Sequence, residues 1–116
     1  MPIITNEQKM SQEAFARISE RSTQDSFKEY KSFALSFPSM IHTCGLVQAV
    51  SFAQAKKRKD YLEDINAVFA KADSSCPLET ESRRAELNDY MRMTLHALSA
   101  ASWLKRYCQA TGGGDD

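Results

Sequence analysis

The chain contains 116 residues, of which 42% are hydrophobic and 26% are charged, values close to those of average soluble globular proteins. This length allows one domain with a single modest core. Fifteen basic and fifteen acidic side chains cancel to a formal net charge of zero, which argues against strong binding of nucleic acid by the free chain. No apolar run approaches the roughly 20 residues of a membrane span and no signal peptide is recognisable, so we expect a soluble, cytoplasmic protein with no membrane partner.

The first two predicted helices follow from apolar residues at helical spacing. Thr5 followed by Gln8 fits a capping box, and the pattern predicts a helix from Asn6 to about Arg21. Ser22 or Thr23 is expected to cap a second helix. The apolar residues that recur along these two helices are Met10, Ala14, Ile18, Phe27, Tyr30, Ala34 and Phe37.

Pro38 is expected to break the second helix, because its ring clashes with a continuing helical backbone. The same ring suits the first turn of a new helix. We therefore predict a short third helix from Pro38 to Cys44, which ends at Gly45 because glycine readily adopts the left-handed conformation that stops helices.

The second half of the chain predicts three further helices. One runs from Leu46 to about Arg58 and the next from Asp60 to Ala72, followed by a loop at 73–77. A long final helix begins near Thr80 or Ser82 and continues to about residue 110, uninterrupted by Gly or Pro. The residues expected to be buried in the first two of these helices are Leu46, Ala49, Val50, Ala53, Leu62, Ile65, Val68 and Phe69.

Together these elements predict an all-α protein, a compact single-domain bundle of five or six helices with a long C-terminal helix. The domain is expected to cover residues 1–110. The remaining segment, 111–116, is rich in Gly and Asp and is expected to be disordered.

The final helix carries two contrasting faces when its residues are placed about 100° apart. The predicted core face contains Leu87, Tyr90, Met91, Thr94, Leu95, Ala97, Leu98, Ala101, Leu104 and Cys108. The opposite face carries Arg92, His96, Ser99, Trp103 and Arg106. Three interpretations stay open: Trp103 is a second core anchor, the face binds a protein partner, or a base stacks on Trp103 while Arg106 contacts phosphate.

Charge is segregated along the chain. No acidic residue occurs between Glu29 and Asp60, and the basic run Lys56-Lys57-Arg58-Lys59 lies inside this stretch. The run can neutralise the carboxyl end of a helix. It can also contact phosphates without reading sequence, and the two roles are compatible.

Catalytic and metal-binding patterns are not recognisable. Cys44, Cys76 and Cys108 form no C-x-x-C pair and lie at no zinc-ligand spacing from a histidine. His42 lies too close to Cys44 to form a convincing nucleophile–base pair. We therefore expect a non-enzymatic chain without metal or cofactor.

Two stretches resemble a known family. Residues 37–52 begin with Phe37-Pro38, continue through a short apolar helix to Gly45-Leu46, and end at an aromatic residue, Phe52. Residues 90–110 end with Trp, an apolar residue, Lys-Arg, an aromatic residue and a final alanine. Both patterns, in this order and in a chain of this length, are similar to the small subunit of the Cmr complex, the type III-B CRISPR–Cas effector of antiviral defence.

The resemblance implies a helical, non-catalytic subunit. Several copies of it would stack along the complex beside the other Cmr subunits, and their basic surface would contact the guide RNA paired with target RNA. On the matching positions, Lys105 and Arg106 would contact RNA or a neighbour, and Trp103 would hold the closing helix or the neighbouring subunit. The charge pattern adds Lys56, Lys57 and Arg92 as candidate RNA contacts, and the polar face adds His96 as a candidate interface residue.

Two alternatives remain at this point. One is a helical adaptor that binds proteins through the face containing Arg92, Trp103 and Arg106, without nucleic acid. The other is the equivalent small subunit of the type III-A Csm complex. Steep salt dependence of RNA binding would separate the RNA-contacting subunits from the adaptor.

Overall fold

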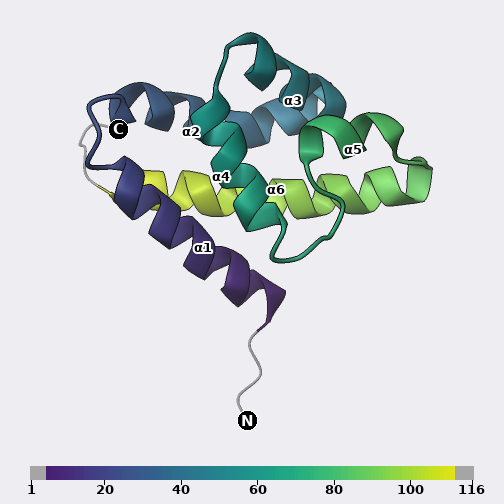
Figure 1. The fold of residues 1–116 in the computed structure, drawn as a ribbon, viewed down its shortest axis with the longest axis horizontal. Coiled ribbons are helices and arrows are strands. Elements are labelled where there is room, and N and C mark those ends of the chain that lie inside the picture. Colours follow the sequence, from purple (N-terminus) through teal and green to yellow (C-terminus); the bar gives the residue numbers. More distant parts are fainter. Residues whose placement is uncertain (1–4, 112–116) are drawn as a thin grey trace.

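The computed structural model describes residues 5–111, and every regular element within this range is an α-helix (Figure 1). The helices are α1 (Asn6–Arg21), α2 (Phe27–Cys44), α3 (Leu46–Ala55), α4 (Lys59–Phe69), α5 (Leu78–Arg84) and α6 (Leu87–Ala110). This arrangement confirms the predicted all-α bundle with a long last helix. The predicted disordered segment, 111–116, lies outside the described residues except for Thr111. Among the helices described, none combines the length and apolar character that crossing a membrane requires.

The beginning of α1 is capped as predicted. The Thr5 hydroxyl accepts a hydrogen bond from the Gln8 amide at 3.1 Å, and the Gln8 side chain accepts one from the Thr5 amide at 2.8 Å. These two bonds satisfy donors that a helix start otherwise leaves without partners. The buried face of α1 then packs against α6 and α4.

The predicted helix break at Pro38 is wrong, because α2 continues through this residue to Cys44. Its N-cap is Ser26 and not Ser22 or Thr23. An internal proline removes one backbone hydrogen bond and typically costs about 3 kcal/mol. Phe37 and Ile41, on either side of Pro38, are both buried, and α2 makes the most extensive helix–helix contact of the fold with α6. Tertiary packing of this face offsets the local penalty.

Gly45 separates α2 from α3 as predicted. Its φ of 89° lies in the region that favours glycine, and its amide donates to the Ile41 carbonyl at 2.9 Å. The amide of Val47 donates to the Tyr90 hydroxyl at 3.1 Å. This bond ties the α2–α3 corner to α6.

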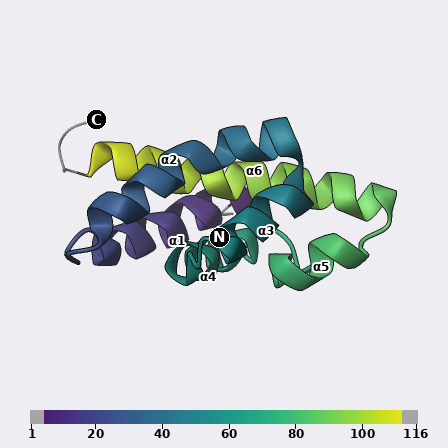
Figure 2. The same cartoon turned by 90° about the horizontal axis from the view of Figure 1, so that it is seen from above.

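The predicted continuous helix from Thr80 or Ser82 to residue 110 is also wrong, because it is divided into α5 and α6. Ala85 and Glu86 adopt extended conformations with ψ of 139° and 167°. The two helices pack on different partners: α5 lies against α3, whereas α6 contacts α1, α2 and α4 (Figure 2). A single straight helix could not satisfy both contacts, and neither Gly nor Pro marks the break in the sequence.

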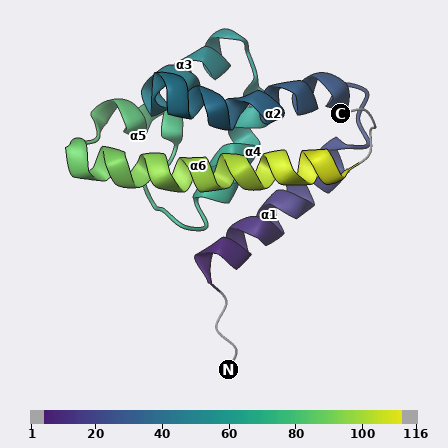
Figure 3. The ribbon, with the colours of Figure 1, turned by 180° about the vertical axis from the view of Figure 1, so that it is seen from behind.

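The buried face of α6 differs in part from the predicted one. Its buried residues are Met93, Ala97, Ala100, Ala101, Leu104 and Cys108. The three alanines among them allow α2 and α4 to approach α6 closely. These two helices contribute the large buried residues Tyr30, Phe37 and Tyr61 to the core. In contrast, Leu87, Met91 and Leu95 were expected in the core, yet they are 72%, 57% and 66% exposed. In Figure 3, α6 runs along one face of the molecule with α2 beside it, so one side of α6 has no helix in front of it.

Candidate nucleic-acid interface

The turn between α3 and α4 presents four consecutive cations. Helix α3 ends at Ala55, three residues before the predicted end, because Lys57 takes a left-handed φ of 57°. The turn is closed by two backbone bonds of 2.9 Å, from Lys56 to the Phe52 carbonyl and from Arg58 to the Ala53 carbonyl. Within residues 5–111, no carboxylate lies within ion-pair distance of any of the four cations at 56–59. Their positive charge is therefore available to an outside anion.

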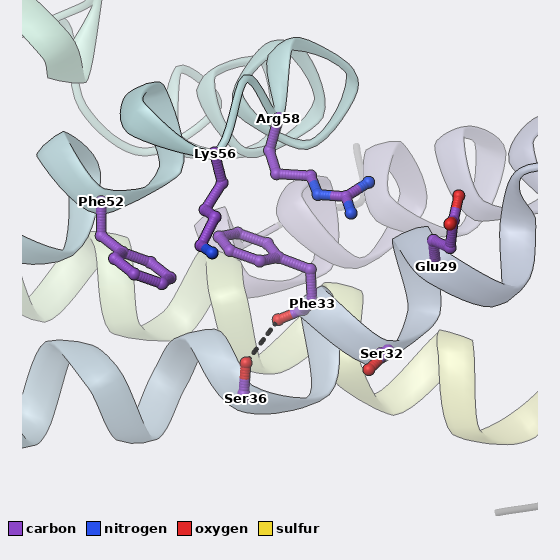
Figure 4. A pocket seen from close by; sticks show the side chains of 7 residues that line it. All are labelled: Glu29, Ser32, Phe33, Ser36, Phe52, Lys56 and Arg58. Carbon is purple, nitrogen blue, oxygen red and sulfur yellow. Dashed lines mark hydrogen bonds between the residues drawn. The ribbon is translucent and has the colours of Figure 1, made fainter.

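A groove of about 300 Å³ lies directly beside this turn (Figure 4). One wall is formed by α2 and the other by the end of α3 and the turn. Its lining residues are Glu29, Ser32, Phe33, Ser36, Phe52, Lys56 and Arg58. The groove thus combines aromatic rings, hydroxyl groups and cations, with one acid at its edge.

The two phenylalanine rings of the groove lie almost parallel. Their planes differ by 8° and their centroids are 6.3 Å apart. The Lys56 ammonium lies 5.5 Å from the centroid of Phe52, and the Arg58 guanidinium lies 5.9 Å from that of Phe33. Cations within about 6 Å of an aromatic face are attracted to it, so both side chains are held at the groove. Such a surface can bind phosphate through its cations and a base through its ring.

A second cationic cluster lies near the carboxyl end of α6. The Trp103 indole is half-buried and donates to the Glu7 carboxylate at 2.7 Å, which joins α6 to α1. The Arg106 guanidinium lies 6.0 Å from the Trp103 ring, and Tyr107 stacks on that ring at 5.9 Å. Within the described residues, neither Lys105 nor Arg106 has a carboxylate at ion-pair distance. Trp103 thus holds two helices together, and beside it Arg106 is exposed and Lys105 is half-buried.

Arg92 and His96 form a third cluster around the buried carboxylate of Asp73. Arg92 donates to Asp73 at 3.1 Å and to Asp89 at 2.7 Å, and His96 Nδ1 lies 2.8 Å from Asp73 Oδ2. Burial alone would raise the pKa of Asp73, but the bonds from Arg92, His96 and Ser75 lower it below its ordinary value. The cluster anchors the loop after α4 to α6. The charge of Arg92 is largely neutralised by Asp73 and Asp89, so a phosphate would have to compete with these carboxylates for it.

The predicted site residues therefore fall into three separate clusters. Lys56 and Lys57 lie on the α3–α4 turn, Trp103, Lys105 and Arg106 at the end of α6, and Arg92 and His96 around Asp73. The sequence analysis did not predict that Phe33, Phe52 and Arg58 lie together in one groove. The signal was present in the acid-free stretch between Glu29 and Asp60, where aromatic residues recur on two helices.

The thiols of Cys76 and Cys108 lie in environments that disfavour the reactive thiolate. Cys108 is buried, and desolvation raises the pKa of its thiol to about 12. The pKa of Cys76 is also raised by burial, with the nearby acids Asp73 and Glu79 adding to the effect. A raised pKa keeps a thiol protonated and weakly nucleophilic. Within residues 5–111, no three potential metal-ligating side chains gather in one place.

Comparison with known proteins gives a consistent match along nearly the whole chain. Residues 6–111 match the model of a family described as CRISPR-associated protein (Cas_Cmr5). The CRISPR system Cmr subunit Cmr5 of Thermus thermophilus is 31% identical over 109 residues, which cover 91% of this chain and 95% of the relative. The crystal structure of a CRISPR-associated Cmr5 family protein, also from Thermus thermophilus, superimposes with a TM-score of 0.83 at 31% identity, covering 93% of this chain and 97% of that one.

Proposed function

We propose, on the premise that this chain belongs to the Cmr5 family of CRISPR-associated proteins, that it is a small subunit of a Cmr complex, the type III-B RNA-guided effector. Several copies would stack beside the other Cmr subunits and contact the guide RNA and its target. The observation that carries the RNA contact is the set of cations at residues 56–59 and 105–106, which have no carboxylate partner within the described residues.

Repetition of the subunit explains how a neutral chain can contribute to RNA binding. A chain of zero net charge has little long-range attraction for RNA. Copies fixed side by side present their basic clusters at a high effective concentration, so weak contacts add up. Phosphate contact and base stacking require no nucleophile, general base or metal, so the proposed role is non-catalytic.

The exposed apolar stripe of α6 supports stacking of copies. Leu87, Met91, Leu95 and the half-buried Leu98 lie at spacings of four, four and three residues, which places them on one side of the helix. Exposed apolar stripes of this kind mark protein-binding surfaces. Acidic Glu86 and Asp89 lie at the amino end of α6, whereas Lys105 and Arg106 lie near its carboxyl end. Because Lys105 and Arg106 are assigned to RNA, the apolar stripe itself is the proposed contact, and we propose a neighbouring copy of the chain as its occupant.

Removal of the cations near the end of α6 tests the RNA contact. Lys105→Ala combined with Arg106→Ala is expected to leave folding intact and to weaken retention of target RNA by the assembled complex, because two phosphate contacts per copy are lost. Filter binding at matched salt measures this retention. Arg83→Ala combined with Arg84→Ala removes the same charge from α5 and serves as the control. Equal retention by both double variants would refute the assignment of RNA contact to the α6 cluster.

An acidic substitution in the stripe tests the stacking. Met91→Glu is expected to reduce the number of copies in each complex, because it places a charge within an apolar contact. Phe15→Glu, at an equally exposed position of α1 (57% for both), is the matched control. Native mass spectrometry counts the copies. If Met91→Glu complexes keep the wild-type number, the stripe does not mediate stacking.

A further inference from the structure

We propose that the groove between α2 and the α3–α4 turn receives a single unpaired nucleotide, with its base against Phe52 and its phosphate beside Lys56. This inference rests on the proposed function and specifies the form of RNA that the groove accepts. Three features of the groove support it: a fixed aromatic platform, cations along its rim, and hydroxyl groups on its wall.

The aromatic platform is packed against the core on its inner side and partly exposed on its outer side, where the Lys56 ammonium lies over the Phe52 ring. Phe33 packs edge-on against the buried Tyr61 with ring centroids 5.3 Å apart. It also packs against the buried Phe37, with the rings tilted and their centroids 5.6 Å apart. Phe52 lies parallel to Phe33 and remains 41% exposed. A base would take the place of the Lys56 ammonium on the Phe52 ring, which frees this cation for the phosphate and leaves the side chains beneath the ring in place. Stacking of bases on such aromatic residues is a main source of affinity for single strands.

A duplex could not use this platform. The base faces inside a duplex are covered by their neighbours, so only phosphates and groove edges are accessible. The face of an exposed ring such as Phe52 can stack only on a base whose own face is uncovered. The geometry therefore favours an unpaired position of the RNA over the continuous guide–target helix.

The polar groups of the groove suggest how the nucleotide is oriented. Lys56 and Arg58 lie at the side formed by the turn, and Ser32 and Ser36 lie along α2 (Figure 4). The Ser36 hydroxyl donates to the Phe33 carbonyl at 3.0 Å, which leaves its oxygen able to accept a bond from a ribose 2′-hydroxyl. Glu29 is the acidic residue that lines the groove. Because its carboxylate repels a phosphate, we expect the phosphate to lie away from Glu29 and beside the cations.

Photocrosslinking in the assembled complex tests this site. A target RNA carrying 5-iodouridine at one position at a time is bound to the complex, irradiated and analysed by mass spectrometry. We expect an unpaired position to crosslink to the peptide that contains Phe52. Phe52→Leu, which keeps apolar bulk but removes the ring on which the base stacks, is expected to abolish this crosslink. Phe52→Tyr, which keeps the ring, should retain it.

The outcomes separate this inference from the proposed function. Normal RNA retention without a crosslink at Phe52, or equal yields from Phe52→Leu and wild type, would overturn the nucleotide site alone. If complexes assembled with the wild-type chain do not retain target RNA at all, both the nucleotide site and the proposed function would be overturned. An acidic peptide is the competing occupant, and it is tested by adding hexaglutamate or hexauridine as a competitor to the crosslinking reaction of the assembled complex. Loss of the Phe52 crosslink with hexaglutamate but not with hexauridine would also overturn the inference.

Discussion

Asp64 is the residue on which three helices converge. Its carboxylate is buried and accepts bonds from Arg21 at 2.9 Å and Arg17 at 3.3 Å, both on α1, and from the Tyr30 hydroxyl of α2 at 2.5 Å. The pKa of Tyr30 is raised well above its ordinary value, by burial first and then by the charge of Asp64, so Tyr30 stays a donor. Asp64 therefore joins α4 to α1 and α2 through charge-assisted bonds.

Substitution of Asp64 should be strongly destabilising. Asp64→Asn keeps the shape of the side chain but leaves two arginines without their buried counterion, and we expect a loss of about 3 kcal/mol in the free energy of unfolding. Glu63→Ala is the control, because Glu63 also contacts Arg21 but its side chain is 67% exposed, and it should cost less than about 1 kcal/mol. Urea denaturation measures both. Similar small losses would show that the network is not a stabilising centre.

At the scale of elements, the sequence predicts helices well where side-chain pattern and packing agree. The capping box of α1, the stop at Gly45 and the buried faces of α3 and α4 follow from local pattern and are confirmed. Pro38 and the α5–α6 break were mispredicted for the same reason: tertiary contacts decided them. The buried face of α2 stabilises the helix across Pro38. The predicted last helix is interrupted because α5 and α6 pack against different helices.

The predicted core face of α6 was only partly correct. It is confirmed at Ala97, Ala101, Leu104 and Cys108 and wrong at Leu87, Met91 and Leu95, whereas the buried Met93 and Ala100 were not predicted. A single sequence cannot tell whether a large apolar residue faces its own core or a partner. The candidate site shows the same limit, since Lys56 and Lys57 were identified from charge, but their juxtaposition with aromatic residues of α2 required the fold.

The break between α5 and α6 can be tested with proline. Glu86 has a φ of −74°, which proline shares, and no protein group accepts a hydrogen bond from its amide within the described residues. Glu86→Pro should therefore change the free energy of unfolding by no more than about 1 kcal/mol. Thr94→Pro, in the middle of α6, is the control and should cost about 3 kcal/mol or more. Thermal denaturation compares them, and a large loss from Glu86→Pro would indicate a continuous helix in solution.

At the scale of the whole molecule, family membership and charge distribution point to a chain that functions as part of an assembly. The two motifs in the sequence predicted the family, and the family match along residues 6–111 confirms it. The molecule has zero net charge, two cationic clusters without a carboxylate partner among its described residues, and an exposed apolar stripe. A free-standing RNA-binding domain would need a basic surplus, whereas a repeated subunit needs only aligned clusters and a contact between copies.

The salt dependence of RNA binding tests this account most directly. The affinity of the reconstituted complex for target RNA is measured from low to high salt, with wild-type subunit and with a subunit lacking the cations Lys56, Lys57, Lys105 and Arg106. We predict that the wild-type complex loses affinity more steeply with salt, because more phosphates are contacted, and that the free chain binds weakly at every salt concentration. Identical slopes for the two complexes would contradict the claim that this subunit contacts RNA.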